Sequence, residues 1–446
     1  MRDSARKGVA ARVLGDLVRI GWRGPRLALP ASVNLGIAGL LAPVINALLA
    51  RASDPEAAIA GFAVAYGLMA LIAIPQLRIQ QLTLVFARSG PSLAKVRRFI
   101  SLLALASFSV GALAAISPLG GWLLAKGFGL SGAPLEQASV ALAPLVAWIP
   151  LACFRTHFHG IMLATGRTGV MWSGIAISLA AAVLSTALLL YLDVPAAAAA
   201  ASGHSIGVAL EVLILFAADR SGYAWPGEAA AVPGYRELAR FFGPLLVAAL
   251  LPSVTIPILH AAMARAPDPA TGIAAFTLAR SVVHLATIPI WGLQPTLLAL
   301  FGRGTPPRAA ATFAYAMGLG ALAITLAISY LGPVNDLVLG QLLGAAGALA
   351  VQGQAAMMLL ALLPPLMAME QVYSSALLAC RRANPFIWIN LLRLAILILT
   401  VAAALLVAPQ AVWVGAAGEF AGLMGEALVT MGFGRSSYRQ LAEAAS

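Results

Sequence analysis

Two Arg–His pairs with the same spacing lie inside strongly apolar stretches of the sequence. Arg155 precedes His159 by four residues, and Arg280 precedes His284 by four. Residues four apart share a face of a helix, so each pair would present a guanidinium and an imidazole side by side. Guanidinium groups hold carboxylates and phosphates through charge-assisted hydrogen bonds. The two pairs therefore indicate places where an anion could bind.

Other polar residues inside apolar stretches extend this set. Asn390 and Arg393 share a helical face, and polar faces on several helices would converge on a solvated cleft. For Arg155 and Arg393 the alternative is that each lies near a helix end and extends its charge to a polar surface. For Asn34 the alternative is a hydrogen bond between helices. The predicted cleft residues are Arg78, Arg155, His159, Arg280, His284, Asn34, Asn390 and Arg393.

Four glutamates lie in the same kind of apolar surroundings. Glu419 and Glu426 are seven residues apart and so share a helical face, and His204 and Glu211 have the same separation. A carboxylate in such a place can take up a proton or pair with a cation. The alternative is hydrogen-bonded packing alone. The predicted coupling or gating residues are Glu211, Glu370, Glu419 and Glu426.

The elements that carry these residues are apolar enough to cross a membrane. Of the 446 residues 61% are hydrophobic and only 10% are charged, too few to cover a soluble protein of this size. Apolar runs of roughly 20 residues, the length of a membrane-spanning helix, recur with short polar gaps. We predict an all-α polytopic membrane protein with twelve transmembrane helices. They lie near residues 27–50, 57–77, 99–118, 135–160, 170–191, 196–217, 240–263, 271–292, 308–331, 349–379, 385–407 and 411–432.

Basic residues are distributed unevenly over the predicted loops. Of the 28 Lys and Arg, three lie in loops that join odd to even helices, and 21 lie in the termini and the other loops. Because basic loops stay in the cytoplasm, we predict that both termini are cytoplasmic. Abundant alanine and scarce lysine indicate a bacterial gene, and hence the inner (plasma) membrane. The charge is scattered, so we expect no nucleic-acid binding despite a net charge of +12.

An internal repeat divides the chain into two halves. Residues 30–80 align without a gap onto residues 244–294, at an offset of 214, with 17 of 51 positions identical. A second stretch agrees at an offset of 215, where Pro150-Leu151 matches Pro365-Leu366. Six helices per half in the same orientation imply a two-fold axis along the membrane normal.

The repeat sets the expected domain boundaries. We predict a cytoplasmic amphipathic N-terminal segment (1–26), an N-lobe (27–220), a cytoplasmic linker (221–236), a C-lobe (237–433) and a cytoplasmic tail (434–446). The second offset places Arg155 opposite Glu370. Opposite charges at equivalent positions could form an ion pair between the lobes. The alternative is that each pairs with a neighbour in its own half.

Two six-helix halves with an early proline in each resemble the multidrug/oligosaccharidyl-lipid/polysaccharide (MOP) exporter superfamily, which includes MATE transporters and lipid-linked oligosaccharide flippases. Within it the sequence is similar to the progressive ankylosis protein family. The similar stretches are 65–86, 284–293, and 392–394 together with 415–426. The resemblance implies a secondary transporter that exports small polyanions of the pyrophosphate, citrate or nucleotide class.

No pattern for a catalytic or metal centre is present. Cys153, His157 and His159 do not all share one helical face, and no nearby carboxylate completes a metal-binding set. No G-x-x-x-x-G-K-[ST] loop occurs. We therefore predict no catalytic residue, metal or cofactor, and transport driven by a gradient, a potential or a separate partner. The expected partners are a small anionic substrate and membrane lipids, and a monomer is compatible with the sequence.

Three other functions remain open at this point. A cation-coupled multidrug exporter of the same superfamily would have a cleft of net negative charge. A lipid-linked precursor flippase would need a cleft open to lipid and often extra helices. An intramembrane transferase would need acid–base or metal clusters at the membrane surface, where the predicted cytoplasmic loops offer few acids.

Overall fold

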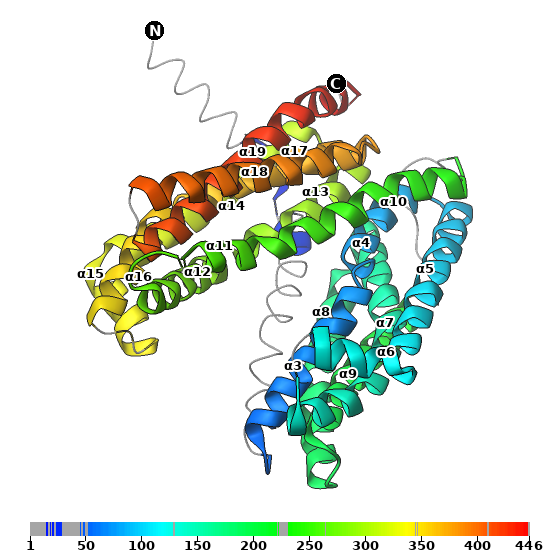
Figure 1. Cartoon of the computed structure of the whole chain (residues 1–446). Coiled ribbons are helices and arrows are strands. Elements are labelled where there is room, and N and C mark those ends of the chain that lie inside the picture. The colour runs from blue at the N-terminus through cyan, green and yellow to red at the C-terminus, as the bar shows by residue number, and fades with distance from the viewer. Residues whose placement is uncertain are drawn as a thin grey trace. The chain divides into compact units, whose positions relative to one another are not determined.

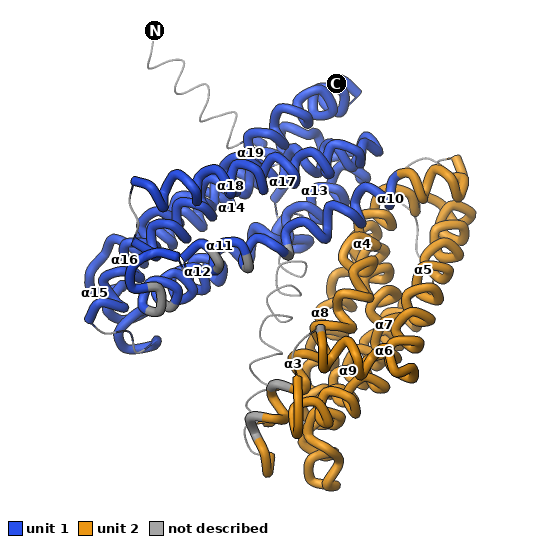
Figure 2. The backbone as a smooth tube through the Cα atoms, viewed as in Figure 1, with its two compact units in different colours: residues 1–33, 241–446 blue, residues 34–240 orange. Residues whose placement is uncertain are grey.

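A computed structural model describes residues 52–127, 130–220, 231–263, 265–343, 347–407 and 410–444, together with short stretches and single residues between 15 and 49 and at 222 and 345. The predicted first helix, 27–50, lies largely outside the described residues, and so does Asn34. The chain forms two compact units (Figure 2). Unit 2 comprises residues 34–240, and unit 1 comprises residues 1–33 and 241–446.

Unit 2 is built from helices alone over its described residues (Figure 1). They are α3 (Pro55–Ile72), α4 (Gln76–Phe86), α5 (Gly90–Ile116), α6 (Pro118–Trp122), a π-helical turn (Leu123–Gly127), α7 (Gly132–Thr165), α8 (Thr168–Tyr191) and α9 (Ala196–Arg220). Helix α7 packs against α3, α4, α5 and α9. It therefore forms the centre of this unit.

Unit 1 is likewise helical over its described residues. Its helices are α10 (Tyr235–Leu250, which begins just before the unit boundary), a 3-10 turn (Leu251–Val254), α11 (Thr255–Met263), α12 (Pro269–Trp291), α13 (Leu293–Gly302), α14 (Pro307–Tyr330), α15 (Gly332–Asn335), a π-helical turn (Asp336–Leu342), α16 (Gly347–Leu360), α17 (Leu363–Ala379), α18 (Pro385–Val407) and α19 (Ala411–Ala444). Helix α19 packs against α11, α12, α16, α17 and α18.

Ten helical segments of the described chain are long and apolar enough to cross a membrane. Prolines explain two of the departures of the observed helices from the predicted ones, because proline cannot donate the hydrogen bond that continues a helix. The second predicted helix runs on through a break at Pro75, as α3 and α4. The tenth is broken just before Pro364 into α16 and α17. The twelfth was predicted too short, since α19 continues through most of the predicted tail.

Close packing at glycine supports the repeat in helices that the sequence alignment did not cover. On α9, a Cβ at Gly203 would collide with the Thr186 side chain of α8. On α19, a Cβ at Gly418 would lie 2.5 Å from the Val401 side chain of α18. Both pairs are related by the same offset of 215. The last two helices of each unit therefore meet at equivalent places, where small residues permit close approach.

The described residues of the N-terminal segment include some that pack on the C-terminal half of the chain. Ile20 is 3% exposed, and Gly24 lies closely against the ring of Phe313 on α14. The Arg308 Nε lies 3.2 Å from a carboxylate oxygen of Asp16. This segment therefore belongs to the same unit as the C-terminal half of the chain.

Candidate functional site

The first Arg–His pair converges on one carboxylate inside unit 2. Arg155 and His159 lie on α7, and Glu211 lies on α9. The His159 Nε2 is 2.8 Å from Oε1 of Glu211, and both side chains are 1% exposed. The Arg155 Nη1 is 3.8 Å from Oε2 of the same glutamate. The two helices thus place one carboxylate between a guanidinium and an imidazole that share a helical face.

The second pair does the same inside unit 1. The Nε of Arg280, on α12, lies 3.0 and 2.9 Å from the two carboxylate oxygens of Glu419, on α19. The His284 Nε2 lies 3.4 Å from Oε1 of that glutamate. His284 also meets the ring of Trp291 edge-on, with centroids 5.4 Å apart. This cluster is more accessible, because the side chains of Arg280 and His284 are 31% and 21% exposed.

A third ion pair joins the last two helices of unit 1. The Arg393 Nη1 lies 2.8 Å from Oε2 of Glu426, with side-chain exposures of 14% and 16%. At the equivalent positions of unit 2, Ser178 stands in place of Arg393 and Glu211 in place of Glu426. The repeat therefore keeps the glutamate and replaces its arginine partner by serine.

The two Arg–His–Glu clusters are not copies of each other. The offset of 215 places Glu211 opposite Glu426, and His204 opposite Glu419. The offset of 214 places Tyr66 opposite Arg280. The same three residue types thus meet in each unit from positions that the repeat does not relate.

Aromatic rings occupy the positions in unit 2 that the ion pair occupies in unit 1. Tyr66 on α3 meets His204 on α9 edge-on, with ring centroids 5.4 Å apart. Trp148 on α7 lies 5.3 Å from Tyr66 and 5.5 Å from His204, again between centroids. The sequence analysis did not select Tyr66 or Trp148. The alignment of Tyr66 with Arg280 was the one signal that could have found the tyrosine.

The remaining predicted residues lie elsewhere. Arg78 is half-buried on α4. Asn390 is buried, and its Nδ2 donates to the Phe386 carbonyl of the same helix. Glu370, half-buried on α17, accepts a hydrogen bond from its neighbour Gln371. The pair between Arg155 and Glu370 stays a prediction, and Arg155 has Glu211 as a local partner.

Histidine and cysteine do not gather into a metal site. In the part of the chain that the structure describes, no three His, Cys, Asp or Glu residues are placed to hold a metal ion. His157 is fully buried and its Nδ1 lies 2.9 Å from the hydroxyl of Thr83, on α4. Its neighbour His159 is engaged with Glu211 instead.

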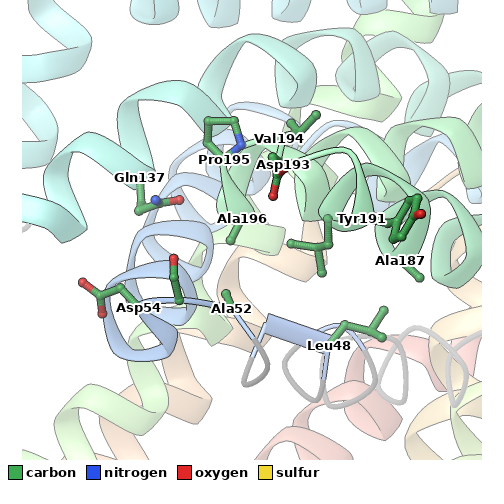
Figure 3. Close-up of a pocket in the computed structure, with 12 residues that line it drawn as sticks. Leu48, Ala52, Asp54, Gln137, Ala187, Tyr191, Asp193, Val194, Pro195 and Ala196 are labelled. Carbon is green, nitrogen blue, oxygen red and sulfur yellow. The ribbon is translucent and has the colours of Figure 1, made fainter.

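A separate pocket of about 520 Å³ lies in unit 2, away from the clusters (Figure 3). It is formed where the segment before α3 meets the end of α8 and the start of α9. Its polar lining residues are Ser53, Asp54, Gln137, Tyr191 and Asp193. Asp54 accepts from the backbone N–H of Ala57, and Gln137 accepts from that of Ala197. Of the predicted cleft and coupling residues that the structure describes, none lines this pocket.

No protein-family model and no curated protein matches the sequence. Solved structures match nearly the whole chain. A MOP superfamily transporter from Pyrococcus furiosus, described as having a binding pocket of reverse polarity, is 17% identical with a TM-score of 0.73, over 94% of this chain and 96% of its own. An outward-facing multidrug resistance MATE transporter is 16% identical (TM-score 0.75), and a MATE transporter in complex with MaL6 is 16% identical (TM-score 0.74), each with the same coverage.

These structural matches show the fold of the chain. The chain has the all-α fold of MATE transporters of the MOP superfamily, and this agrees with the fold class predicted from the internal repeat. The likeness to the progressive ankylosis family stays a prediction.

Proposed function

We propose that this protein is a secondary membrane transporter that exports a small organic or inorganic polyanion, of the pyrophosphate, citrate or nucleotide class, by alternating access of its two lobes. The fold supports transport, because the matching structures are transporters rather than enzymes. One observation at Arg280 supports the choice of an anion.

The two terminal nitrogens of the Arg280 guanidinium are available to a ligand. Its Nε holds both oxygens of Glu419, while its two terminal nitrogens make no hydrogen bond to any described residue. The side chain is 31% exposed. Two parallel N–H groups on one guanidinium match a carboxylate or phosphate in bidentate geometry. An arriving anion can therefore bind Arg280 while Glu419 still holds it in position.

Charge balance favours an anion over a cation. The glutamates Glu211, Glu419 and Glu426 each lie within 4 Å of an arginine, at 3.8, 2.9 and 2.8 Å. A cation would have to compete with a fixed guanidinium for every one of them. These glutamates would keep the arginines from standing as single buried charges when no substrate is bound.

The membrane potential would drive this export. The cell interior is negative, and moving one charge through 100 mV changes the free energy by about 2.3 kcal/mol. A trianion that leaves the cell would gain roughly 7 kcal/mol, a factor of ~10^5 in its distribution. We therefore propose transport without a coupled ion.

A cation-coupled multidrug exporter is the second candidate. It is favoured by the multidrug MATE transporter among the matching structures and by the two aspartates at the pocket of unit 2. A lipid-linked precursor flippase is a third function known in this superfamily, and no contact described above favours it.

Uptake of radiolabelled substrate into proteoliposomes would test the proposal. We expect accumulation of pyrophosphate, citrate or ATP under an imposed potential, and no accumulation of an organic cation such as tetraphenylphosphonium beyond that of protein-free liposomes. Transport of the cation by the protein, with none of the three anions transported, would replace this proposal by the multidrug exporter.

A further inference from the structure

Buried nitrogen atoms of Trp148, Arg155 and His204 have no hydrogen-bond partner among the described residues. They are Nε1 of Trp148 and Nε of Arg155, both on α7, and Nε2 of His204 on α9. Trp148 is 2% exposed and His204 is 6% exposed. Buried polar groups are almost always hydrogen-bonded, so each of these atoms requires an explanation.

The three side chains belong to one place in the fold. Trp148 and Arg155 are seven residues apart, two turns along the same side of α7. The ring of His204 lies 5.5 Å from that of Trp148. Arg155 lies 3.8 Å from Glu211, which is seven residues from His204 and so on the same side of α9. The unpartnered nitrogens therefore line the same contact between α7 and α9.

The chemistry of these nitrogens selects the ligand. An indole N–H and a guanidinium N–H can only donate, and the imidazole Nε2 donates when it carries the proton. The carboxylate of the neighbouring Glu211 is already held by His159 at 2.8 Å. A ligand whose oxygens accept hydrogen bonds would supply the acceptors that these donors lack.

We propose that Trp148, Arg155 and His204 form an oxyanion-binding site inside unit 2 that takes a carboxylate or phosphate oxygen of an incoming anion. Arg155 is the accessible member, with its side chain 20% exposed, so the anion meets the guanidinium first. The role of this site in transport rests on the proposed function, whereas the binding itself does not.

The repeat provides an independent argument for an anion at this place. The position equivalent to His204 in unit 1 is Glu419, whose carboxylate accepts from Arg280. Unit 1 therefore carries its own acceptor at this level of the helices. Unit 2 has imidazole there instead, and an external oxyanion would supply the acceptor that its sequence lacks.

Direct binding to the purified full-length protein can test the site. The measurements are made in the Arg280→Gln background, so that binding at the guanidinium of unit 1 does not contribute. Isothermal titration with pyrophosphate, citrate and chloride is compared for this parent, for Trp148→Phe and for His204→Phe. Both replacements keep an aromatic ring in the cluster and remove one donor. Trp172→Phe, on the exposed side of α8, is the matched control.

The parent and the control should bind pyrophosphate or citrate with the same affinity. Each donor variant should bind at least about tenfold more weakly, because each loses a hydrogen bond to a charged group. Equal affinity in all variants, or binding of chloride alone, would overturn the site. If the single replacement Arg280→Gln abolished all oxyanion binding, this site would be overturned and the proposed function would stand. Absence of oxyanion binding in the wild-type protein would overturn both.

Discussion

Arg280 contacts both carboxylate oxygens of Glu419 through a single nitrogen, its Nε, although the two residues are 139 positions apart in the chain. This geometry fixes the guanidinium against α19 and leaves its two terminal nitrogens free of hydrogen bonds to the described residues. The pair is neutral, yet its cationic half remains 31% exposed. An arginine held in this way is preorganised to receive an anion.

Replacing Arg280 should weaken anion binding in unit 1 without unfolding the protein. Arg280→Gln loses the charge and two potential hydrogen bonds, and we expect the Kd of the unit 1 site to rise at least about 100-fold, while the oxyanion site of unit 2 is retained. Arg280→Lys should be intermediate, because it keeps the charge but loses the planar fork. Titration calorimetry measures the Kd, with exposed Arg435→Gln as the control. A Kd unchanged in Arg280→Gln would exclude this residue from the substrate site.

Removing the carboxylate partner should have the opposite effect on affinity. Glu419→Gln leaves Arg280 without a charged neighbour, so an anion should bind several-fold more tightly. The empty protein should also melt at a lower temperature, and saturating substrate should restore most of the loss. Thermal unfolding with and without substrate measures both effects. Weaker binding in Glu419→Gln would show that the glutamate contributes to the site in another way.

Burial rather than distance should decide the stability of the ion pairs. The carboxylate of Glu211 is 1% exposed and lies 3.8 Å from Arg155, whose side chain is 20% exposed. The carboxylate of Asp219 is 6% exposed and lies 2.7 Å from Arg97, whose side chain is 35% exposed. We expect Glu211→Gln to cost roughly 3 kcal/mol, because it leaves buried partners without their counter-charge. Asp219→Asn should cost less despite the shorter contact, because Arg97 keeps access to a polar surface. A larger loss for Asp219→Asn in unfolding experiments would contradict this order.

The glycines of the repeat should differ sharply in tolerance. A Cβ at Gly203 would collide with Thr186 and with the backbone of α8, so Gly203→Ala should cost on the order of 1–3 kcal/mol. A Cβ added at Gly67, on α3, would have no other atom within 4 Å. Gly67→Ala should stabilise by up to about 1 kcal/mol through helix propensity. Comparable melting temperatures for the two variants would argue against tight α8–α9 packing.

The membrane fold was predictable because lipid imposes simple rules on sequence. Apolar runs of the right length predicted most of the helices. For α18 the prediction gave both ends correctly, at residues 385 and 407. Two observed helices differ from the predicted ones because of proline, at Pro75 and Pro364. The break at Pro75 was not predicted, because a proline inside a transmembrane segment can either kink a helix or divide it.

The partners of the polar residues could not be predicted in the same way. Helical spacing correctly placed Arg155 with His159 and Arg280 with His284, since spacing is a local property. The glutamate that each pair meets depends on how helices pack, and the repeat pointed from Arg155 to Glu370 rather than to Glu211. Trp148 has no polar neighbour in the sequence. Its unpartnered indole nitrogen is visible only once α7 and α9 are assembled.

Substrate efflux against a set membrane potential tests the central claim most directly. Proteoliposomes loaded with labelled pyrophosphate or citrate are given a potassium/valinomycin potential, and efflux is followed at equal pH on both sides. The account predicts efflux that rises as the interior becomes more negative and that is lost in Arg280→Gln. Efflux that ignores the potential, follows a pH gradient and is lost in Glu370→Gln or Glu419→Gln would contradict it and indicate proton antiport.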